Sequence, residues 1–128
     1  MENKPLQPYY LPQVSAPFKF IVDNLKEMNV EWFPVLVTIS TLKPLQKSVD
    51  MDKVTEIAEN MKDDGKSISP VFISNKNHIL DGHHRVSGIK YKLGENSKIK
   101  AIKINADDKD GASMLKIIQD RWERQNKK

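Results

Sequence analysis

The chain of 128 residues contains no cysteine. This absence excludes disulfide bonds, thiolate metal ligands and cysteine nucleophiles at once. The sequence also has no apolar run near the ~18 residues that a membrane-spanning helix needs. Its start lacks the basic segment followed by an apolar one that marks a secretory signal. We therefore expect a cytoplasmic protein that does not enter a membrane.

Excess charge is scarce outside the C-terminal end. The net charge of the chain is +4. Residues 121–128 account for +3 of it, with four basic side chains against Glu123, so that residues 1–120 carry only +1. Such an end is more typical of a solvated tail than of a surface that binds duplex DNA. A DNA partner is therefore only weakly supported.

Proline is concentrated in the first 17 residues, which contain four of the seven prolines. This density opposes both helix and interior strand, so we expect an extended arm over residues 1–17. The rest, residues 18–128, has the length and composition of a single domain with its own core. The arm has an apolar centre, Tyr9-Tyr10-Leu11. It is expected to pack on its own domain or, as the alternative, on a second subunit in a homodimer.

Hydrophobic spacing predicts alternating helices and strands in residues 18–128. Helices are predicted over residues 18–28, over residues 51–64 with Asp50 as the cap and Gly65 as the end, from Gly82 to Gly94, and from a cap at Asp108 or Asp110. Strands are predicted over residues 33–40, 71–74, 78–80 and 99–104. The order predicts an α+β fold, a small mixed β-sheet flanked by helices.

Polar chemistry is densest where the third strand meets the following helix, at Asp81-Gly82-His83-His84-Arg85. A helix N-terminus offers unpaired N–H groups and partial positive charge, which suit a phosphate. If Asp81 is the N-cap, the other four residues fill the first turn. Glycine lets a ligand approach the backbone, arginine offers a bidentate pair of donors, and either histidine can donate or shuttle a proton near neutral pH.

Asp81 does not suit a bare phosphate site, because a carboxylate repels a phosphate. It does suit a site in which it binds Mg²⁺, accepts the proton of a substrate hydroxyl, or orients a histidine. The alternative is that Asp81 only caps the helix and that the histidines lie in solvent. The residues alone leave both interpretations open.

Several segments, in this order and spacing, resemble the ParB/sulfiredoxin superfamily: Leu42-Lys43-Pro44-Leu45-Gln46, the helix at 51–64, Gly65, Ser69-Pro70-Val71 and residues 79–85. The resemblance covers residues 35–104 and implies a ParB/sulfiredoxin-like fold whose junction binds nucleotide phosphates. Sulfiredoxins carry a cysteine at the position of His83, so their activity is excluded. Chromosome-partitioning members carry a different box and a further helix-turn-helix domain, for which we expect no room after Ile104.

The motif is most similar to that of the free-serine kinases of this superfamily. The similarity implies ADP or ATP with Mg²⁺ as cofactors and phosphoryl transfer to a small hydroxyl substrate such as serine. It assigns phosphate binding to Gly82, His83, His84 and Arg85, with Gln46 and Ser69 lining the pocket. Asp81 would act in catalysis or hold the metal, and His83 would assist.

One departure from those kinases concerns catalysis. Gln46 occupies the position of their catalytic glutamate, and an amide cannot accept the substrate proton. The alternative is a non-catalytic nucleotide-binding or DNA-associated ParB-like module, of the kind that phages encode. If the protein is an enzyme but not a phosphotransferase, the alternative is a nucleotide hydrolase.

Overall fold

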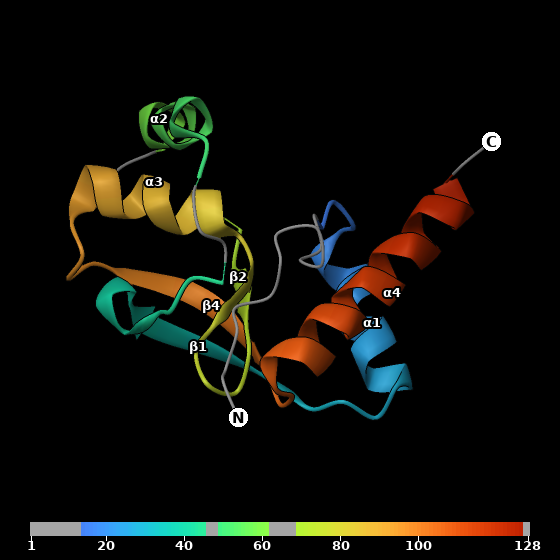
Figure 1. The fold of residues 1–128 in the computed structure, drawn as a ribbon. Helices are drawn as coiled ribbons and strands as arrows, with labels where there is room; N and C mark the ends of the chain where they lie inside the picture. The colour runs from blue at the N-terminus through green and yellow to red at the C-terminus, as the bar shows by residue number, and fades with distance from the viewer. Residues whose placement is uncertain (1–13, 46–48, 62–68, 127–128) are drawn as a thin grey trace.

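The computed structural model describes residues 14–45, 49–61 and 69–126. Its helices are α1 (Phe18–Glu27), α2 (Met51–Asn60), α3 (His83–Leu93) and α4 (Asp108–Asn126), with a short 3₁₀ turn η2 (Ile39–Thr41). Its strands are β1 (Trp32–Thr38), β2 (Val71–Ile73), β3 (Ile79–Asp81) and β4 (Lys98–Ile104). The strands form one sheet in the order β1-β4-β2-β3 (Figure 1). None of the described helices is long and apolar enough to cross a membrane.

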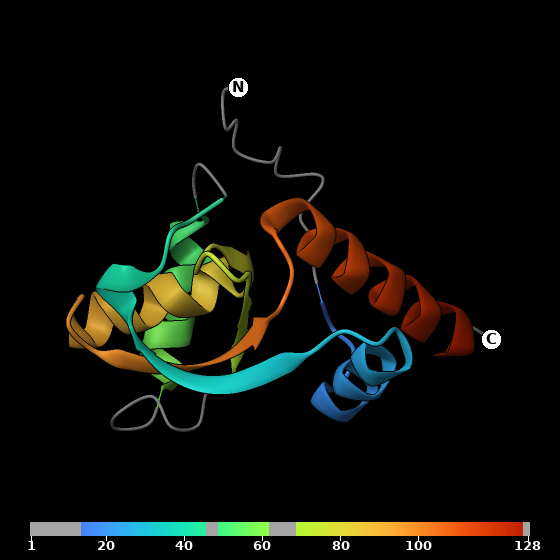
Figure 2. The ribbon, with the colours of Figure 1, turned by 90° about the horizontal axis from the view of Figure 1, so that it is seen from below.

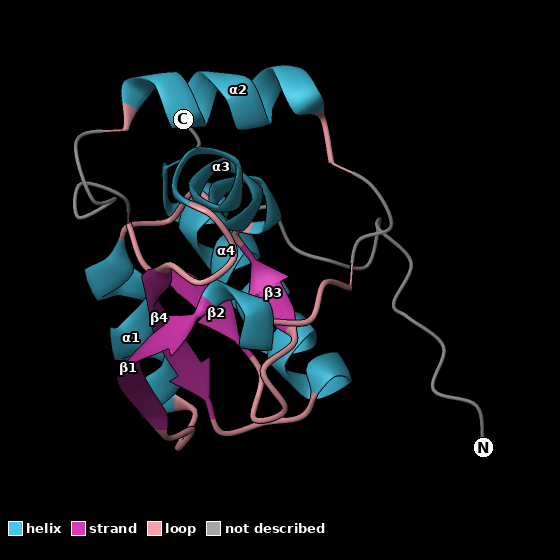
Figure 3. Cartoon of the chain, turned by 90° about the vertical axis from the view of Figure 1, so that its left-hand side faces the viewer, coloured by secondary structure: helices cyan, strands magenta, loops and turns pink. Residues whose placement is uncertain are grey.

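The sheet is mixed, because β4 pairs antiparallel with β1 and parallel with β2, while β2 and β3 pair antiparallel. Helices α1 and α4 lie side by side on one face of the sheet (Figures 1 and 2). On the other face lies α3, and α2 crosses over its outer side (Figure 3). This architecture confirms the predicted α+β class, a small mixed sheet flanked by helices.

Strand β4 shows how the sequence builds both sides of the sheet. Alternate residues of a strand point to opposite faces. Ile99 and Ala101 are buried in the core beneath α3, whereas Ile102 and Ile104 are buried in the core beneath α1 and α4. A single seven-residue strand therefore contributes to two hydrophobic cores.

The aromatic side chains of the α1/α4 side pack edge to face. Trp32 contacts Phe18 with ring centroids 6.1 Å apart, and Trp122 contacts Phe20 at 5.3 Å. Both tryptophans are partly buried against the same core. The arrangement joins the beginning of α1 to β1 and to the last turns of α4.

The C-terminal basic segment packs on the domain only at its beginning, whereas residues 123–126 are helical and exposed. Residues 121–126 belong to α4, and Arg121 donates from Nη1 to Asn24 Oδ1 at 2.8 Å. Trp122, the next residue, packs against the hydrophobic core beneath α1 and α4. The amphipathic pattern of α4 thus continues as far as Trp122, which packs on Phe20 of α1.

Helix α2 begins as predicted and ends earlier. Asp50 accepts from the N–H of Asp52 at 2.9 Å and so caps the helix. The predicted end at Gly65 is wrong, because α2 stops at Asn60. Met61 has extended backbone (φ −73°, ψ 128°), its side chain is buried under α3, and its carbonyl accepts from Lys92 Nζ at 2.8 Å. Gly65 lies outside the described residues.

Helix α4 is also capped differently from the prediction. The carboxylate of Asp107, and not that of Asp108 or Asp110, accepts from the N–H of Asp110 at 2.8 Å. Asp108 is engaged elsewhere: its Oδ1 lies 2.6 Å from Ser74 Oγ and 2.9 Å from His78 Nδ1. This contact ties the turn between β2 and β3 to α4 and removes Asp108 from capping.

The described end of the N-terminal arm lies on its own domain. Gln119 of α4 is buried, and its Oε1 accepts from the N–H groups of Ser15 at 2.8 Å and Ala16 at 3.0 Å. Its Nε2 donates to Ser15 Oγ at 2.8 Å. Residues 1–13, including the apolar centre of the arm, lie outside the described residues, so their packing stays a prediction.

Candidate functional site

The junction between β3 and α3 is built around Gly82. Asp81 is the last residue of β3, and Gly82 is the N-cap of α3 with φ 108°, so the interpretation in which Asp81 caps the helix does not hold. A Cβ atom on Gly82 would lie 2.5 Å from Val71 Cγ1. The left-handed backbone and this close approach both require glycine. Asp81 cannot serve as the cap because it pairs with Phe72 in the sheet and its carboxylate binds Arg85.

His83 is a buried hydrogen-bond acceptor. Its Nε2 accepts from the backbone N–H of Leu45 at 3.1 Å. Burial, together with the charge on His84, lowers the pKa of His83 to about 4. The imidazole is therefore neutral at pH 7, and since Nε2 accepts, its proton lies on Nδ1. His83 carries no positive charge for a phosphate at neutral pH.

His84 plays a parallel role. Its Nε2 accepts from the backbone N–H of Asp50 at 3.1 Å. The two histidines thus hold Leu45 and Asp50, which lie on either side of residues 46–48, against the beginning of α3. Gln46 itself lies outside the described residues. The sequence analysis missed this role, because both donors are backbone N–H groups and no side-chain pattern announces them.

Arg85 joins three segments through its guanidinium. Nη2 lies 2.6 Å from Asp81 Oδ2. Nη1 donates to the carbonyl oxygens of Ser69 at 3.3 Å and Pro70 at 3.1 Å. Ser69 thus contacts Arg85 through its backbone carbonyl.

Asp81 has a second partner in the N-terminal segment. Its Oδ1 accepts from the N–H of Val14 at 3.3 Å. Burial raises the pKa of Asp81 above its ordinary value, and the positive charge of Arg85 only partly offsets that effect. The carboxylate is therefore shared between the arm and the guanidinium, and both are contacts within the chain.

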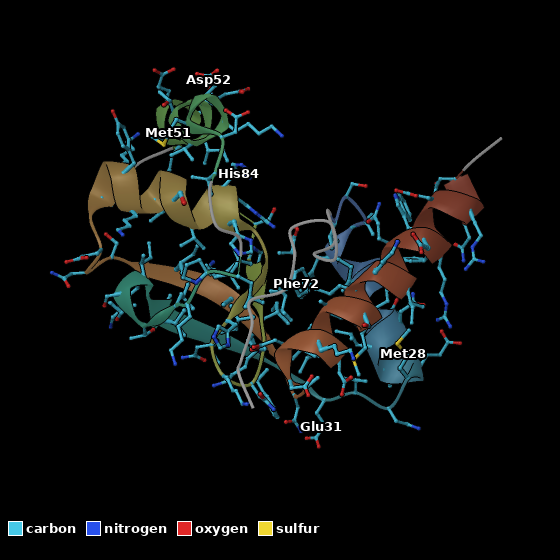
Figure 4. The ribbon with its side chains drawn as sticks, in the orientation of Figure 1. Met28, Glu31, Met51, Asp52, Phe72 and His84 are labelled. Carbon is cyan, nitrogen blue, oxygen red and sulfur yellow. The ribbon has the colours of Figure 1, made fainter. Side chains whose placement is uncertain are left out.

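A groove of about 520 Å³ opens between α2 and α3 beside this junction. Figure 4 shows His84 at the beginning of α3, on the side that α2 covers. Ile57 and Met61 provide an apolar wall. The polar lining consists of Lys53, Glu56, Asn60, Ser69, His84 and Arg85. Asp81 does not belong to the lining.

Gly88, inside α3, lies at a point where α2 and α3 are in close contact. A Cβ on Gly88 would lie 2.8 Å from Ile57 Cγ2, so α2 and α3 approach closely at this point. The side chains of α2 that line the groove recur every three or four residues, which places them on one helical face.

The structure therefore brings the predicted site residues Asp81, Gly82, His83, His84, Arg85 and Ser69 to one junction. It engages most of their polar atoms with one another and with the backbone. In the part of the chain that the structure describes, no group of three or more His, Asp or Glu side chains could hold a metal ion.

No family model matches the chain, and no curated protein matches it. Among solved structures it is similar to that of a Pnob8-like ParB-N domain, with a TM-score of 0.48 and 16% sequence identity over 63% of this chain. The chain covers 32% of that chain, about a third of its length. The matched structure is a ParB-N domain, from the group that the sequence resembles. The α+β class follows from the helices and the mixed sheet themselves and does not depend on this match.

Proposed function

We propose that this protein binds a nucleotide, with its phosphates at the beginning of α3 and its base in the groove between α2 and α3. The observation that carries the proposal is the groove itself. Its volume of about 520 Å³ lies in the range of small-molecule sites, and basic Lys53, His84 and Arg85 line it beside a helix N-terminus. Ile57 and Met61 provide apolar surface against which a base can pack.

The end of α3 suits the phosphates for a second reason. Gly82 has no side chain with which to accept from the first-turn N–H groups of the helix. Those groups, and the partial positive charge of the helix end, favour an anionic ligand. The φ of 108° and the close approach of Val71 require glycine at this N-cap, so no capping side chain competes with a ligand for those N–H groups.

Binding without catalysis is the function that the geometry supports best. A general base must be free to accept a proton from the substrate. Asp81 is bound to Arg85 at 2.6 Å and to the N–H of Val14 at 3.3 Å. His83 accepts from Leu45, and the amide of Gln46 is no base at all.

Phosphoryl transfer from ADP or ATP to a small hydroxyl substrate such as serine is the second candidate. The observation that favours it is the raised pKa of Asp81, which makes this carboxyl a better proton acceptor than an exposed one. Mg²⁺ would be held by Asp81 together with phosphate oxygens, since Mg²⁺ is commonly bound through one or two carboxylates and the substrate.

Calorimetric titration tests the binding proposal. We expect ADP, ATP or CTP, with or without Mg²⁺, to bind with a dissociation constant below about 1 mM. Lys53→Ala should weaken binding about fivefold, because an exposed cation is removed from the groove wall without loss of core. Lys116→Ala, an exposed change on α4, serves as the matched control. The proposal fails if none of the three nucleotides binds at millimolar concentration.

Phosphorus NMR separates the two candidates. Incubation of the protein with the nucleotide that binds, Mg²⁺ and serine should produce no phosphoserine if the protein is a binding module. Turnover that disappears in Asp81→Ala would instead establish the transferase.

A further inference from the structure

We propose that Asp81 is an internal competitor for the phosphate site, a role that rests on the function proposed above. Its carboxylate holds the Arg85 guanidinium that a phosphate would otherwise take. An anion that takes the N–H group of Arg85 bound by Asp81 must displace this carboxylate.

The contacts of Arg85 carry this inference. The 2.6 Å contact from Nη2 to Asp81 Oδ2 is a charge-assisted hydrogen bond of the short, strong kind. The other terminal nitrogen donates to two backbone carbonyls. A phosphate that binds Arg85 through both terminal nitrogens therefore competes with Asp81 and with these carbonyl oxygens for the N–H groups of the guanidinium.

The Arg85 half of the ion pair lines the groove that the ligand would occupy. Arg85 Nη2 is 3.1 Å from the point that a Cβ on Gly82 would occupy. The guanidinium therefore lies against the N-cap of α3, and Asp81 precedes that N-cap directly in the chain. The negative charge of Asp81 therefore repels an incoming phosphate. It also takes the favourable interaction with the positive end of the α3 dipole that the phosphate would otherwise make.

The pair is shielded from water, so its charge has more effect than that of a surface pair. The side chain of Asp81 is 11% exposed and that of Arg85 is 24% exposed. Partial burial lowers the screening of the interaction. Burial also raises the pKa of Asp81, so the charged carboxylate is held less favourably than in water, which assists its displacement.

A competitor of this kind selects ligands by charge. A carboxylate offers Arg85 no more than Asp81 already supplies. A diphosphate carries more negative charge and more acceptor oxygens, which also reach the first-turn N–H groups of α3. The site is therefore expected to prefer a phosphate group to a carboxylate.

The test compares inorganic pyrophosphate and inorganic phosphate on the full chain and on Asp81→Asn. The amide keeps an oxygen for the N–H of Val14 and loses the charge. We expect calorimetry to show at least about fivefold tighter pyrophosphate binding in the variant, because a bond to a charged group no longer has to be broken. The affinity for phosphate should rise as well, because the same ion pair no longer has to be broken. Asp81→Ser should behave in the same way.

Asp108→Asn is the matched control. Asp108 also forms a partly buried pair, at 2.9 Å to His78, which precedes β3 in the chain. This variant should leave both affinities unchanged, and thermal melts will show that all variants are folded. Pyrophosphate binding that is unchanged or weaker in both Asp81 variants would overturn the inference and make Asp81 a positioning residue for Arg85. Loss of all nucleotide and pyrophosphate binding, in the wild type and the variants alike, would instead overturn the proposed function together with the inference.

Discussion

At the scale of single residues, the fold changes the chemistry of His83 most. An exposed histidine titrates near pH 6.5, whereas burial and the charge on His84 lower the pKa of His83 to about 4. The unfolded chain therefore binds a proton that the folded chain excludes between these two pH values. Folding stability must fall as the pH decreases through that range.

We expect His83 to cost the protein up to about 3 kcal/mol of unfolding free energy as the pH falls from 7 to 4. Asp81 acts in the opposite direction, because its raised pKa makes the folded state bind its proton more readily above pH 3.8. Urea unfolding at several pH values checks the difference between wild type and His83→Gln. The glutamine amide can accept from Leu45 without titrating, so the slope between pH 6.5 and 4 should become shallower. Equal slopes for the two proteins would contradict the assignment.

The sequence locates the site but not the partners of its residues. The junction is recognisable because its glycine and basic residues are adjacent in the chain. The donors to His83 and His84 are backbone N–H groups 38 and 34 residues away, which no local pattern reveals. The capping rule assigned Asp81 to the helix because it considers only neighbours in sequence. In the structure the carboxylate of Asp81 binds the guanidinium of Arg85 instead of capping the helix.

At the scale of elements, the arm and α4 are held together by one side chain. Gln119 is 6% exposed and satisfies the N–H groups of both Ser15 and Ala16. Its replacement would leave two backbone donors without this acceptor, and unsatisfied buried groups are costly.

Gln119→Leu should therefore lower the unfolding free energy by about 1–3 kcal/mol. It should also speed hydrogen exchange at the amides of Ser15 and Ala16, while exchange within the sheet changes less. Mass spectrometry of peptides that cover residues 14–17 measures this. Asp120→Asn, which alters an exposed pair with Lys116, is the control. Undisturbed protection at residues 15 and 16 would show that other contacts hold the segment.

Element types could be predicted better than element ends. The sequence predicts the four α-helices from their amphipathic spacing and the four strands from apolar or β-branched runs, but it does not predict the 3₁₀ turn η2, whose first two residues fall in the predicted strand 33–40. The ends depend on distant contacts: α2 stops at Asn60 because Met61 turns into the core under α3. In the same way, residues 121–126 are helical because Trp122 and Arg121 bind α1. These contacts cannot be predicted from the charge or the composition of the sequence.

At the scale of the whole molecule, the sheet separates two hydrophobic cores that share β4. Both tryptophans lie on the α1/α4 side, so their fluorescence reports on that core alone. Ile89 of α3 lies in the other core and is 1% exposed. The two cores give a direct measure of cooperativity.

We expect Ile89→Ala to cost about 2–5 kcal/mol through lost burial and a residual cavity. If the two cores unfold together, the midpoint by tryptophan fluorescence shifts as far as the midpoint by circular dichroism. Leu115→Ala, in the core that contains the tryptophans, is the reference. A fluorescence midpoint that stays in place in Ile89→Ala would show two independently unfolding halves.

The position of α2 outside α3 has a consequence for detecting a ligand. Because α2 packs mainly on α3, it is the described helix that can detach with the least disturbance of the sheet. A molecule lodged between the two helices would have to leave before α2 could lift away. At a ligand concentration of one hundred times the dissociation constant, mass action adds about 2.7 kcal/mol to that local opening. Resistance of α2 to a protease would then report occupancy of the groove, even for a compound that touches no part of the cleaved bond.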